Sequence, residues 1–141
     1  MTDAGAGTIL IVEDNPDHAL LVRIAARRVY PDLDVRIVGD GEKATAYLSG
    51  NAPFENRLAH PFPRLLILDL VMPRLDGFGL LAWIDDQPQL KELPVVTFTS
   101  SVNPGDEERA LALGADAFYT KPADLDELSN TVRAIVERWL D

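Results

Sequence analysis

The chain has 141 residues, the length of one typical domain, and 47% of them are hydrophobic, which excludes global disorder. Its formal charge of −10 disfavours binding to nucleic acid or anionic lipid, and no apolar run reaches the roughly 18 residues of a membrane helix. The chain has no cysteine and no secretory signal, which excludes disulfides and fits a cytoplasmic protein.

The first half of the chain alternates between short apolar runs, typical of strands, and longer runs with apolar residues three and four apart, typical of helices. We expect a strand at 8–12, a helix at 15–29, an edge strand at 33–39, a helix at 41–50 and a surface loop at 51–63. Asn15 is suited to cap the first of these helices, and Gly50 to end the second. The loop carries three prolines, which fit neither a helix nor a central strand.

The second half continues the alternation. We expect a strand at 65–68, a helix at 76–87, a strand at 93–100, a helix at 104–114, a strand at 116–120 and a helix at 124–140. Gly114 is placed to end the second of these helices, and Asp124 to cap the third. Five strands, each followed by a helix, predict an α/β fold in which helices cover both faces of a parallel sheet. No repeat or linker divides the chain, so we expect one domain over 1–141 without an effector domain.

Residues with reactive side chains follow the strands at the edge where open parallel sheets bind ligands. They are Glu13 and Asp14 after the first strand, Asp69 after the third, Thr99 at the end of the fourth and Lys121 after the fifth. If the first and third strands are neighbours, three carboxylates meet, and like charges ~4 Å apart repel by about 4 kcal/mol at an effective dielectric of ~20. The cluster then either shares a proton or holds a divalent cation, and hard oxygen ligands suit Mg²⁺.

Magnesium bound among these carboxylates would suit the cluster to phosphoryl transfer, because the ion can bridge a carboxylate and an incoming phosphoryl group. A carboxylate can accept that group as an aspartyl phosphate, while the Thr99 hydroxyl and the Lys121 ammonium donate to its oxygens. Each residue taken singly also has a structural explanation. Asp69 could form a turn, and the negative charge of Glu13-Asp14 could favour the dipole of the next helix. Thr99 is a common strand residue, and Lys121 could be a surface lysine. Their coincidence at one edge favours the functional interpretation.

Separated motifs, in order and at suitable spacing, resemble the receiver domain of bacterial two-component response regulators. They are "ILIVEDN", "DLVMPRLDG", "VVTFTSS" and "LGADAFYTKP", and they extend over nearly the whole chain. The resemblance implies a flavodoxin-like (βα)5 fold, a doubly wound parallel five-stranded sheet with strand order 2-1-3-4-5. It also implies a phosphoprotein that takes its phosphoryl group from a sensor histidine kinase, catalyses only its own phosphorylation and dephosphorylation, and signals through altered protein–protein contacts.

The resemblance also implies roles for the acidic residues. Asp69 is the phosphoacceptor and a magnesium ligand. Asp14 is a direct ligand of the ion, and Glu13 is a ligand through a water molecule. The backbone carbonyl of Val71 completes the protein's share of the coordination.

By the same resemblance, Thr99 is the switch hydroxyl, Lys121 pairs with the phosphoryl group, and the peptide bond before Pro122 is cis. One position departs from the family: the switch aromatic is commonly tyrosine, and here it is Phe118, which has no hydroxyl. Tyr119 points to the opposite face of its strand and cannot replace it. We expect a switch that is weaker or that depends on packing alone; the plain alternative is that Phe118 is a core aromatic.

A finer resemblance, to stand-alone regulators paired with phytochrome-type histidine kinases, rests on the loop at 51–63 and on the segments "YLSG", "PQLKELPVV" and "ERWL". It implies a bacteriophytochrome as the kinase and light as the signal. Without an effector domain, the output comes from a protein surface, or the chain passes its phosphoryl group onward as a phosphorelay intermediate.

The terminal helix offers a surface for self-association. Its apolar stripe, expected to dock on the sheet, consists of Leu125, Leu128, Val132, Ile135 and Trp139. Val136, Leu140 and the tip of Trp139 extend past that stripe, so we expect a homodimer through this helix, with the helix at 104–114 or the last strand as further contact candidates. His18 and His60 are expected to be surface residues.

Three other functions compete with a signalling switch. An aspartyl-phosphate phosphohydrolase would carry a D-x-D motif at its nucleophile, with the second aspartate as general acid. Here Val71 stands where that second aspartate would be. Because Val71 cannot orient an attacking water, we also expect slow self-dephosphorylation. A flavodoxin-like cofactor binder should present hydroxyls and amides after the first strand, where "EDNPDH" presents carboxylates. A degenerate receiver used only for docking conflicts with the complete set of pocket residues.

Overall fold

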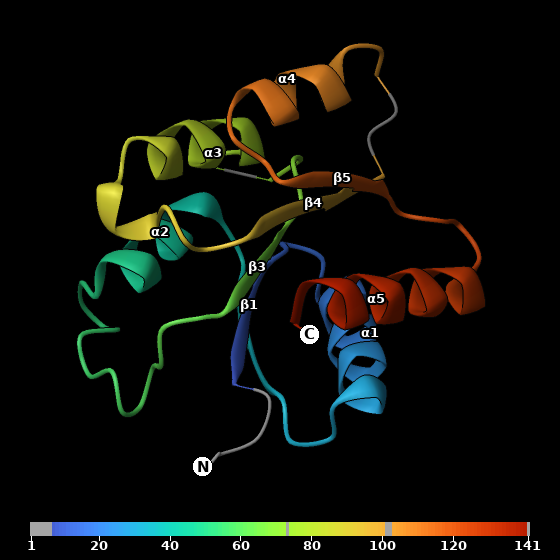
Figure 1. The fold of residues 1–141 in the computed structure, drawn as a ribbon, viewed down its shortest axis with the longest axis horizontal. Helices are drawn as coiled ribbons and strands as arrows, with labels where there is room; N and C mark the ends of the chain where they lie inside the picture. Colours follow the sequence, from blue (N-terminus) through green and yellow to red (C-terminus); the bar gives the residue numbers. More distant parts are fainter. Residues whose placement is uncertain (1–6, 73, 101–102, 141) are drawn as a thin grey trace.

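In the computed structural model, which describes residues 7–72, 74–100 and 103–140, five parallel strands form one sheet in the order β2-β1-β3-β4-β5 (Figure 1). The strands are β1 (Thr8–Val12), β2 (Asp34–Val38), β3 (Leu65–Leu68), β4 (Val95–Thr99) and β5 (Ala117–Thr120). The helices are α1 (Pro16–Val29), α2 (Gly41–Ser49), α3 (Gly77–Asp85), α4 (Asp106–Ala112), α5 (Leu125–Leu140) and the short 3₁₀ helix η1 (Pro88–Leu90). The predicted flavodoxin-like fold and strand order are confirmed, and β2 is an edge strand as expected.

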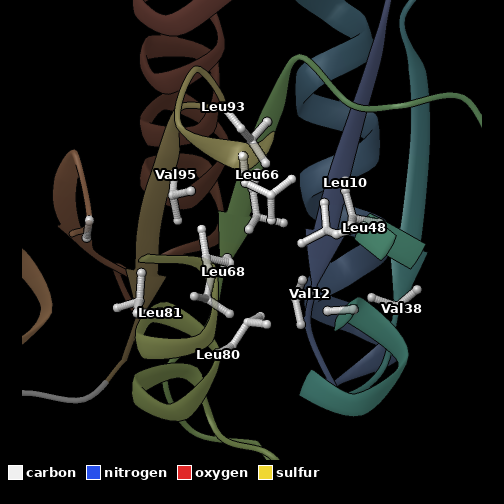
Figure 2. Packing of buried hydrophobic residues seen from close by; sticks show 14 of the residues in the cluster. Leu10, Val12, Val38, Leu48, Leu66, Leu68, Leu80, Leu81, Leu93 and Val95 are labelled. Carbon is white, nitrogen blue, oxygen red and sulfur yellow. The ribbon is translucent and has the colours of Figure 1, made fainter. Parts of the chain in front are cut away.

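Helices cover both faces of the sheet. Figure 1 shows α1 and α5 on one face and α2, α3 and α4 on the other. Ile9 of β1 contributes to the core on the α1–α5 face, whereas Leu10 contributes to the core on the α2–α4 face. In that second core, Leu66 and Leu68 of β3 pack among side chains from β1, β4, α2 and α3 (Figure 2). Because successive strand residues point to opposite faces, a strand covered on both sides must be apolar at every position, which explains the unbroken "LLIL" of β3.

Local signals set the ends of the helices. The Asn15 side chain accepts hydrogen bonds from the backbone N–H groups of Asp17 (2.9 Å) and His18 (3.3 Å), so it caps α1 as predicted. Gly50 ends α2 in the left-handed conformation, with φ of 72°. The helix expected at 76–87 is shorter in the structure, where α3 ends at Asp85. The reason is Pro88, the first residue of η1, because a proline disfavours the helical conformation in the residue before it.

The terminal helix differs from the prediction. Val136 and Leu140, expected to extend past the docking stripe, are 0% and 6% exposed and belong to the core of the α1–α5 face. The reason is that α5 packs against α1 and also shares a core with residues of the sheet, so the buried stripe of α5 is wider than contact with the sheet alone would require. Trp139 is half-buried, and its Nε1–H donates to the Tyr119 hydroxyl at 3.1 Å. Val136 and Leu140 are therefore wrong as dimer contacts. No helix in the described part of the chain is both long and apolar enough to cross a membrane.

Candidate functional site

Two neighbouring strands bring the acidic residues together. Val12 of β1 pairs with Leu68 of β3, and the Asp69 N–H donates to the Val12 carbonyl at 3.0 Å. Glu13 and Asp14 leave β1 at the point where Asp69 leaves β3. One carboxylate oxygen from each of these three residues lies within 4.8 Å of the others. The predicted convergence of three carboxylates is confirmed.

The three carboxylates differ in their surroundings. Glu13 and Asp69 are buried, at 5% and 7% exposed, whereas Asp14 is exposed. Burial raises the pKa of Glu13 above its usual range, and the nearby charge of Asp69 raises it further, against the lowering effect of hydrogen bonds from Lys121 and from the Asn15 N–H. The pocket therefore holds an excess of negative charge that a further cation would relieve.

Lys121 supplies the positive charge inside this cluster. Its backbone N–H donates to the Thr99 carbonyl at 2.8 Å, which fixes the segment after β5 against the end of β4. Its side chain is 3% exposed, and Nζ donates to the Glu13 carboxylate and to Asp69 Oδ2, the latter at 2.9 Å. The alternative that Lys121 is a solvated surface lysine is wrong.

The peptide bond after Lys121 corrects one expectation. Among the described residues, the cis peptide bond lies between Ala52 and Pro53 in the loop before β3, and the bond between Lys121 and Pro122 is trans. The cis isomer expected at Pro122 is therefore wrong. The trans isomer of such a bond is intrinsically favoured by about 0.5–1 kcal/mol, and the Lys121 side chain reaches both carboxylates from this trans backbone.

The two expected switch residues lie on the α2–α4 side of the sheet. Thr99 is fully buried at the end of β4. Phe118 of β5 stands opposite Thr97 in register, and it is half-buried against the core of the α2–α4 face. Since residues two apart in a strand share a face, Thr99 and Phe118 point to the same side. Tyr119 packs in the other core, as expected, so it cannot supply the hydroxyl that Phe118 lacks.

The loop between β3 and α3 carries Val71, the residue expected to offer a backbone carbonyl to the metal. The Val71 N–H donates to Asp69 Oδ1 at 3.2 Å, and the Val71 side chain is 63% exposed at this edge. The Gly77 N–H donates to the Leu70 carbonyl at 3.1 Å and closes the loop. The backbone around Asp69 is therefore held by two hydrogen bonds within the loop.

The same loop is attached to the start of α2, a contact that the sequence did not suggest. Asp40 is buried at 1% exposed, caps α2 by accepting from the Lys43 N–H at 2.8 Å, and pairs with the Arg74 guanidinium at 2.7 Å. The Gly41 N–H also donates to the Leu75 carbonyl at 3.1 Å. Sequence reasoning missed Asp40, although an aspartate directly before a helical segment is a signal that could have found the cap; no local signal pointed to an arginine partner 34 residues away.

The two histidines are also placed differently from the prediction. His18 is half-buried in the first turn of α1, and its Nδ1 lies 3.1 Å from Lys121 Nζ. His60 is half-buried beside the rings of Tyr47 and Phe54. Both are half-buried rather than fully exposed, so the interpretation as surface residues holds in part, but neither side chain is without contacts. For His18 one signal was available: the first turn of a helix that begins directly after Glu13-Asp14 lies next to the acidic pocket.

The donor set fits a hard divalent cation. Three carboxylates that can each offer an oxygen within 4.8 Å of the others are the ligand type that Mg²⁺ prefers. Asp14 is exposed, so the cluster is reachable from solvent. These residues could therefore hold magnesium.

Comparison with known proteins agrees with this geometry. A sequence model of the response regulator receiver domain matches residues 9–133. Response regulator Rcp1 of Synechocystis sp. is 35% identical, over 94% of this chain and 88% of its own length. The crystal structure of the phosphorylated cyanobacterial phytochrome response regulator RcpA superposes with a TM-score of 0.89 at 35% identity, covering 95% of this chain and 94% of its own. The Mn²⁺-bound form of Rcp1 superposes with a TM-score of 0.87 at 35% identity and the same coverage.

Proposed function

Because the chain belongs to the response regulator receiver domain family, a family of signalling switches, we propose that it accepts a phosphoryl group on Asp69 in a two-component system. One observation carries the assignment to this residue. Asp69 is buried beside two further carboxylates, and its Oδ2 accepts a hydrogen bond from the Lys121 ammonium. An aspartate in a purely structural turn would need neither the acidic neighbours nor the buried lysine.

The reaction is a phosphoryl transfer from a phosphohistidine of the kinase. A carboxylate oxygen of Asp69 forms a bond to phosphorus while the phosphorus–nitrogen bond breaks, and the imidazole leaves with the electron pair. The charge on the transferring group rests on its oxygens. The Lys121 ammonium donates to one of these oxygens and the Thr99 hydroxyl to another, which stabilises the group during and after transfer.

We propose Mg²⁺ as the cofactor of this transfer. Asp14 and Asp69 would hold it directly, Glu13 through a water molecule, and the Val71 carbonyl would complete the set. Bound there, the ion would neutralise charge on the phosphoryl oxygens. The hard-oxygen cluster supports this choice, and so does the similar protein Rcp1, which has been crystallised with Mn²⁺.

The proposed phosphodonor is a sensor histidine kinase of the bacteriophytochrome type, in the cytoplasm. RcpA, which the chain resembles over nearly its full length, is a phytochrome response regulator. The surface next to the site suits a protein partner. Leu20 and Ile24 of α1 and Leu125 of α5 are exposed, and Leu20 and Leu125 line one groove with His18. We propose that the kinase covers these apolar side chains when it presents its phosphohistidine to Asp69.

A phosphorelay intermediate would use the same site and pass the phosphoryl group to a second protein. A phosphohydrolase acting on small phosphates is less well supported, because the exposed side chain two residues after Asp69 is that of Val71, which cannot act as an acid. We therefore propose that the chain catalyses only its own phosphorylation and dephosphorylation.

The phosphoacceptor is tested by mass spectrometry after incubation with acetyl phosphate. We expect the wild type to gain one phosphoryl group in the presence of Mg²⁺ and none in the presence of a chelator. Asp69→Asn should gain none under either condition, whereas Asp32→Asn, at an exposed turn, should behave as the wild type. Equal phosphorylation of wild type and Asp69→Asn would refute the assignment of this residue.

A further inference from the structure

Each of the three N–H donors of the buried Lys121 ammonium has an acceptor atom beside it. Its three N–H groups face Glu13 Oε1, Asp69 Oδ2 and His18 Nδ1, the last at 3.1 Å. Because the Lys121 side chain is 3% exposed, water cannot easily replace a missing acceptor. The His18 imidazole therefore completes the set of hydrogen bonds that holds the ammonium in the pocket.

The chemistry of the two groups fixes how they interact. An ammonium only donates hydrogen bonds, so the Nδ1 atom of His18 must accept with its lone pair. The imidazole is then neutral, and its own proton is on Nε2. His18 thus offers Lys121 an acceptor without adding a charge to a pocket that already holds three carboxylates.

We propose that His18 is a positioning residue for phosphoryl transfer, acting through Lys121. The proposal rests on the proposed function of Asp69. When Asp69 is phosphorylated, Lys121 must turn a donor from the Asp69 carboxylate to a phosphoryl oxygen. The contact with His18 would keep the ammonium directed into the pocket during this exchange, when a bound metal and the phosphoryl group would occupy Glu13 and Asp69.

A neutral acceptor suits this position better than a charged one. A carboxylate in place of His18 would add a fourth negative charge near the incoming phosphoryl group and would hold Lys121 away from it. The backbone of α1 keeps the imidazole in place, because the Asn15 side chain accepts from the His18 N–H at 3.3 Å in the first turn. His18 is not part of the three-carboxylate group that could hold a metal, so its role is separate from metal binding.

Three substitutions separate this role from simple packing. In His18→Asn, the side-chain oxygen lies two bonds from Cβ, as Nδ1 does in histidine, so an acceptor stays in place. In His18→Gln the oxygen lies one bond further out, and His18→Leu has no acceptor. Because His18 is half-buried at a helix start, none of the three should prevent folding, which circular dichroism checks.

The rate of phosphorylation by acetyl phosphate and Mg²⁺ is the first measurement. A hydrogen bond to a charged group is worth about 1.5–3 kcal/mol, and the lower end corresponds to about a tenfold change in rate. We expect His18→Leu and His18→Gln to react about tenfold more slowly than the wild type, and His18→Asn to react within about twofold of it. Equal rates for all four proteins, or a His18→Asn rate as slow as that of His18→Leu, would overturn the proposal.

A second measurement does not depend on phosphorylation. Nuclear magnetic resonance of the ¹⁵N-labelled protein at about pH 8, where histidine side chains are mostly neutral, reports which ring nitrogen carries the proton. We expect Nε2 of His18 to be protonated, and the Nδ1 resonance to shift in Lys121→Met. A proton on Nδ1 would refute the contact itself. If the wild type accepts no phosphoryl group but shows the expected imidazole, the proposed function fails while the His18–Lys121 contact stands without a role in transfer.

Discussion

At the scale of single residues, the site depends on one positive charge placed among carboxylates. Lys121 is buried and donates to both Glu13 and Asp69, which come from different strands. Without the ammonium, two buried carboxylates would face each other uncompensated, a situation that typically costs several kcal/mol. The same side chain therefore stabilises the resting pocket, and it already contacts Asp69, the proposed phosphoacceptor, so it would be available to a phosphoryl group there.

The exposed side chain of Val71 leads to a prediction about the lifetime of the phosphorylated state. Val71 follows Asp69 by two residues, its N–H donates to Asp69 Oδ1, and it is 63% exposed, so beside Asp69 it offers no polar side-chain group to orient an attacking water. We expect Val71→Asn to shorten the half-life of the aspartyl phosphate severalfold, because an amide can hold water next to phosphorus. The half-life is measured by the loss of the phosphorylated mass after removal of acetyl phosphate. An isosteric control, Val71→Thr, tests whether any polar atom suffices, and an unchanged half-life in Val71→Asn contradicts the explanation.

At the scale of elements, the loop between β3 and α3 is fixed by the start of α2. Asp40 caps α2 and binds Arg74, whose backbone is in the left-handed region with φ of 63°. Gly41 packs so closely that a Cβ atom there would lie 2.1 Å from the Leu75 carbonyl oxygen. Arg74 and Leu75 belong to the loop that carries Val71, so the position of the proposed metal ligand depends on a helix from another part of the chain.

Asp40 provides a test of this attachment. Burial alone would raise the pKa of Asp40, but hydrogen bonds from the Lys43 N–H and the Arg74 guanidinium outweigh it and hold this pKa below its usual range. We expect Asp40→Ala to lower the free energy of unfolding at pH 7 by about 1–2 kcal/mol, the value of a helix cap. Urea unfolding measures this, with Glu42→Ala as the control at an exposed position beside the same arginine.

The same residue predicts a pH dependence. A carboxyl whose pKa is lower in the folded chain than in the unfolded chain stabilises the fold fully above its unfolded pKa, here about 3.9. That contribution is lost as the pH falls from there through the lower folded pKa. The difference in stability between wild type and Asp40→Ala should therefore be constant from about pH 5 to 7 and decrease below about pH 4. A difference that grows on acidification would contradict the direction of the pKa shift.

At the scale of the whole molecule, the two cores hold the sheet so that β1 and β3 end at the same edge, where the carboxylates meet. A metal that binds only this folded arrangement must stabilise it. We expect Mg²⁺ at about a hundredfold above its dissociation constant to add about 2.7 kcal/mol to the free energy of unfolding and to raise the melting temperature by several degrees.

The control for the metal is Asp14→Asn. Asp14 is exposed, so its replacement should change the stability of the metal-free protein little while abolishing the response to Mg²⁺. Differential scanning calorimetry with and without Mg²⁺ measures both. A melting temperature that rises equally in the two proteins would mean that the ion acts elsewhere.

Self-association is also a property of the whole molecule, and the burial of Val136 changes how it is tested. Val136→Ala should lower the free energy of unfolding by about 2 kcal/mol, because the side chain is fully buried within the monomer. A homodimer through α5 stays a prediction. Its contacts must come from the exposed face of that helix and from Trp139. The Arg138 guanidinium lies over the Trp139 ring, at 5.2 Å from the ring centroid. Sedimentation should show Trp139→Ala dissociating at a higher concentration than the wild type; an equal dissociation constant would exclude this surface.

The sequence by itself determined the elements, their order and the edge at which the reactive residues gather. Apolar runs, the Asn15 cap and the Gly50 end are local signals whose effects extend over a few residues, so they can be recognised without knowing what packs against them. Alternating strands and helices then imply a parallel sheet, and the strand ends bring Glu13, Asp14 and Asp69 together once β1 and β3 are neighbours.

Only the tertiary structure decided which side chains meet across long separations. Val136 is buried because α5 meets α1, and Arg74 reaches Asp40 across 34 residues. His18 lies beside Lys121 across 103 residues. Periodicity along one helix shows which face is apolar, but it cannot show how wide a face its neighbours cover or which polar group from another segment arrives beside it. Those contacts exist only after packing, since each depends on the positions of two elements at once.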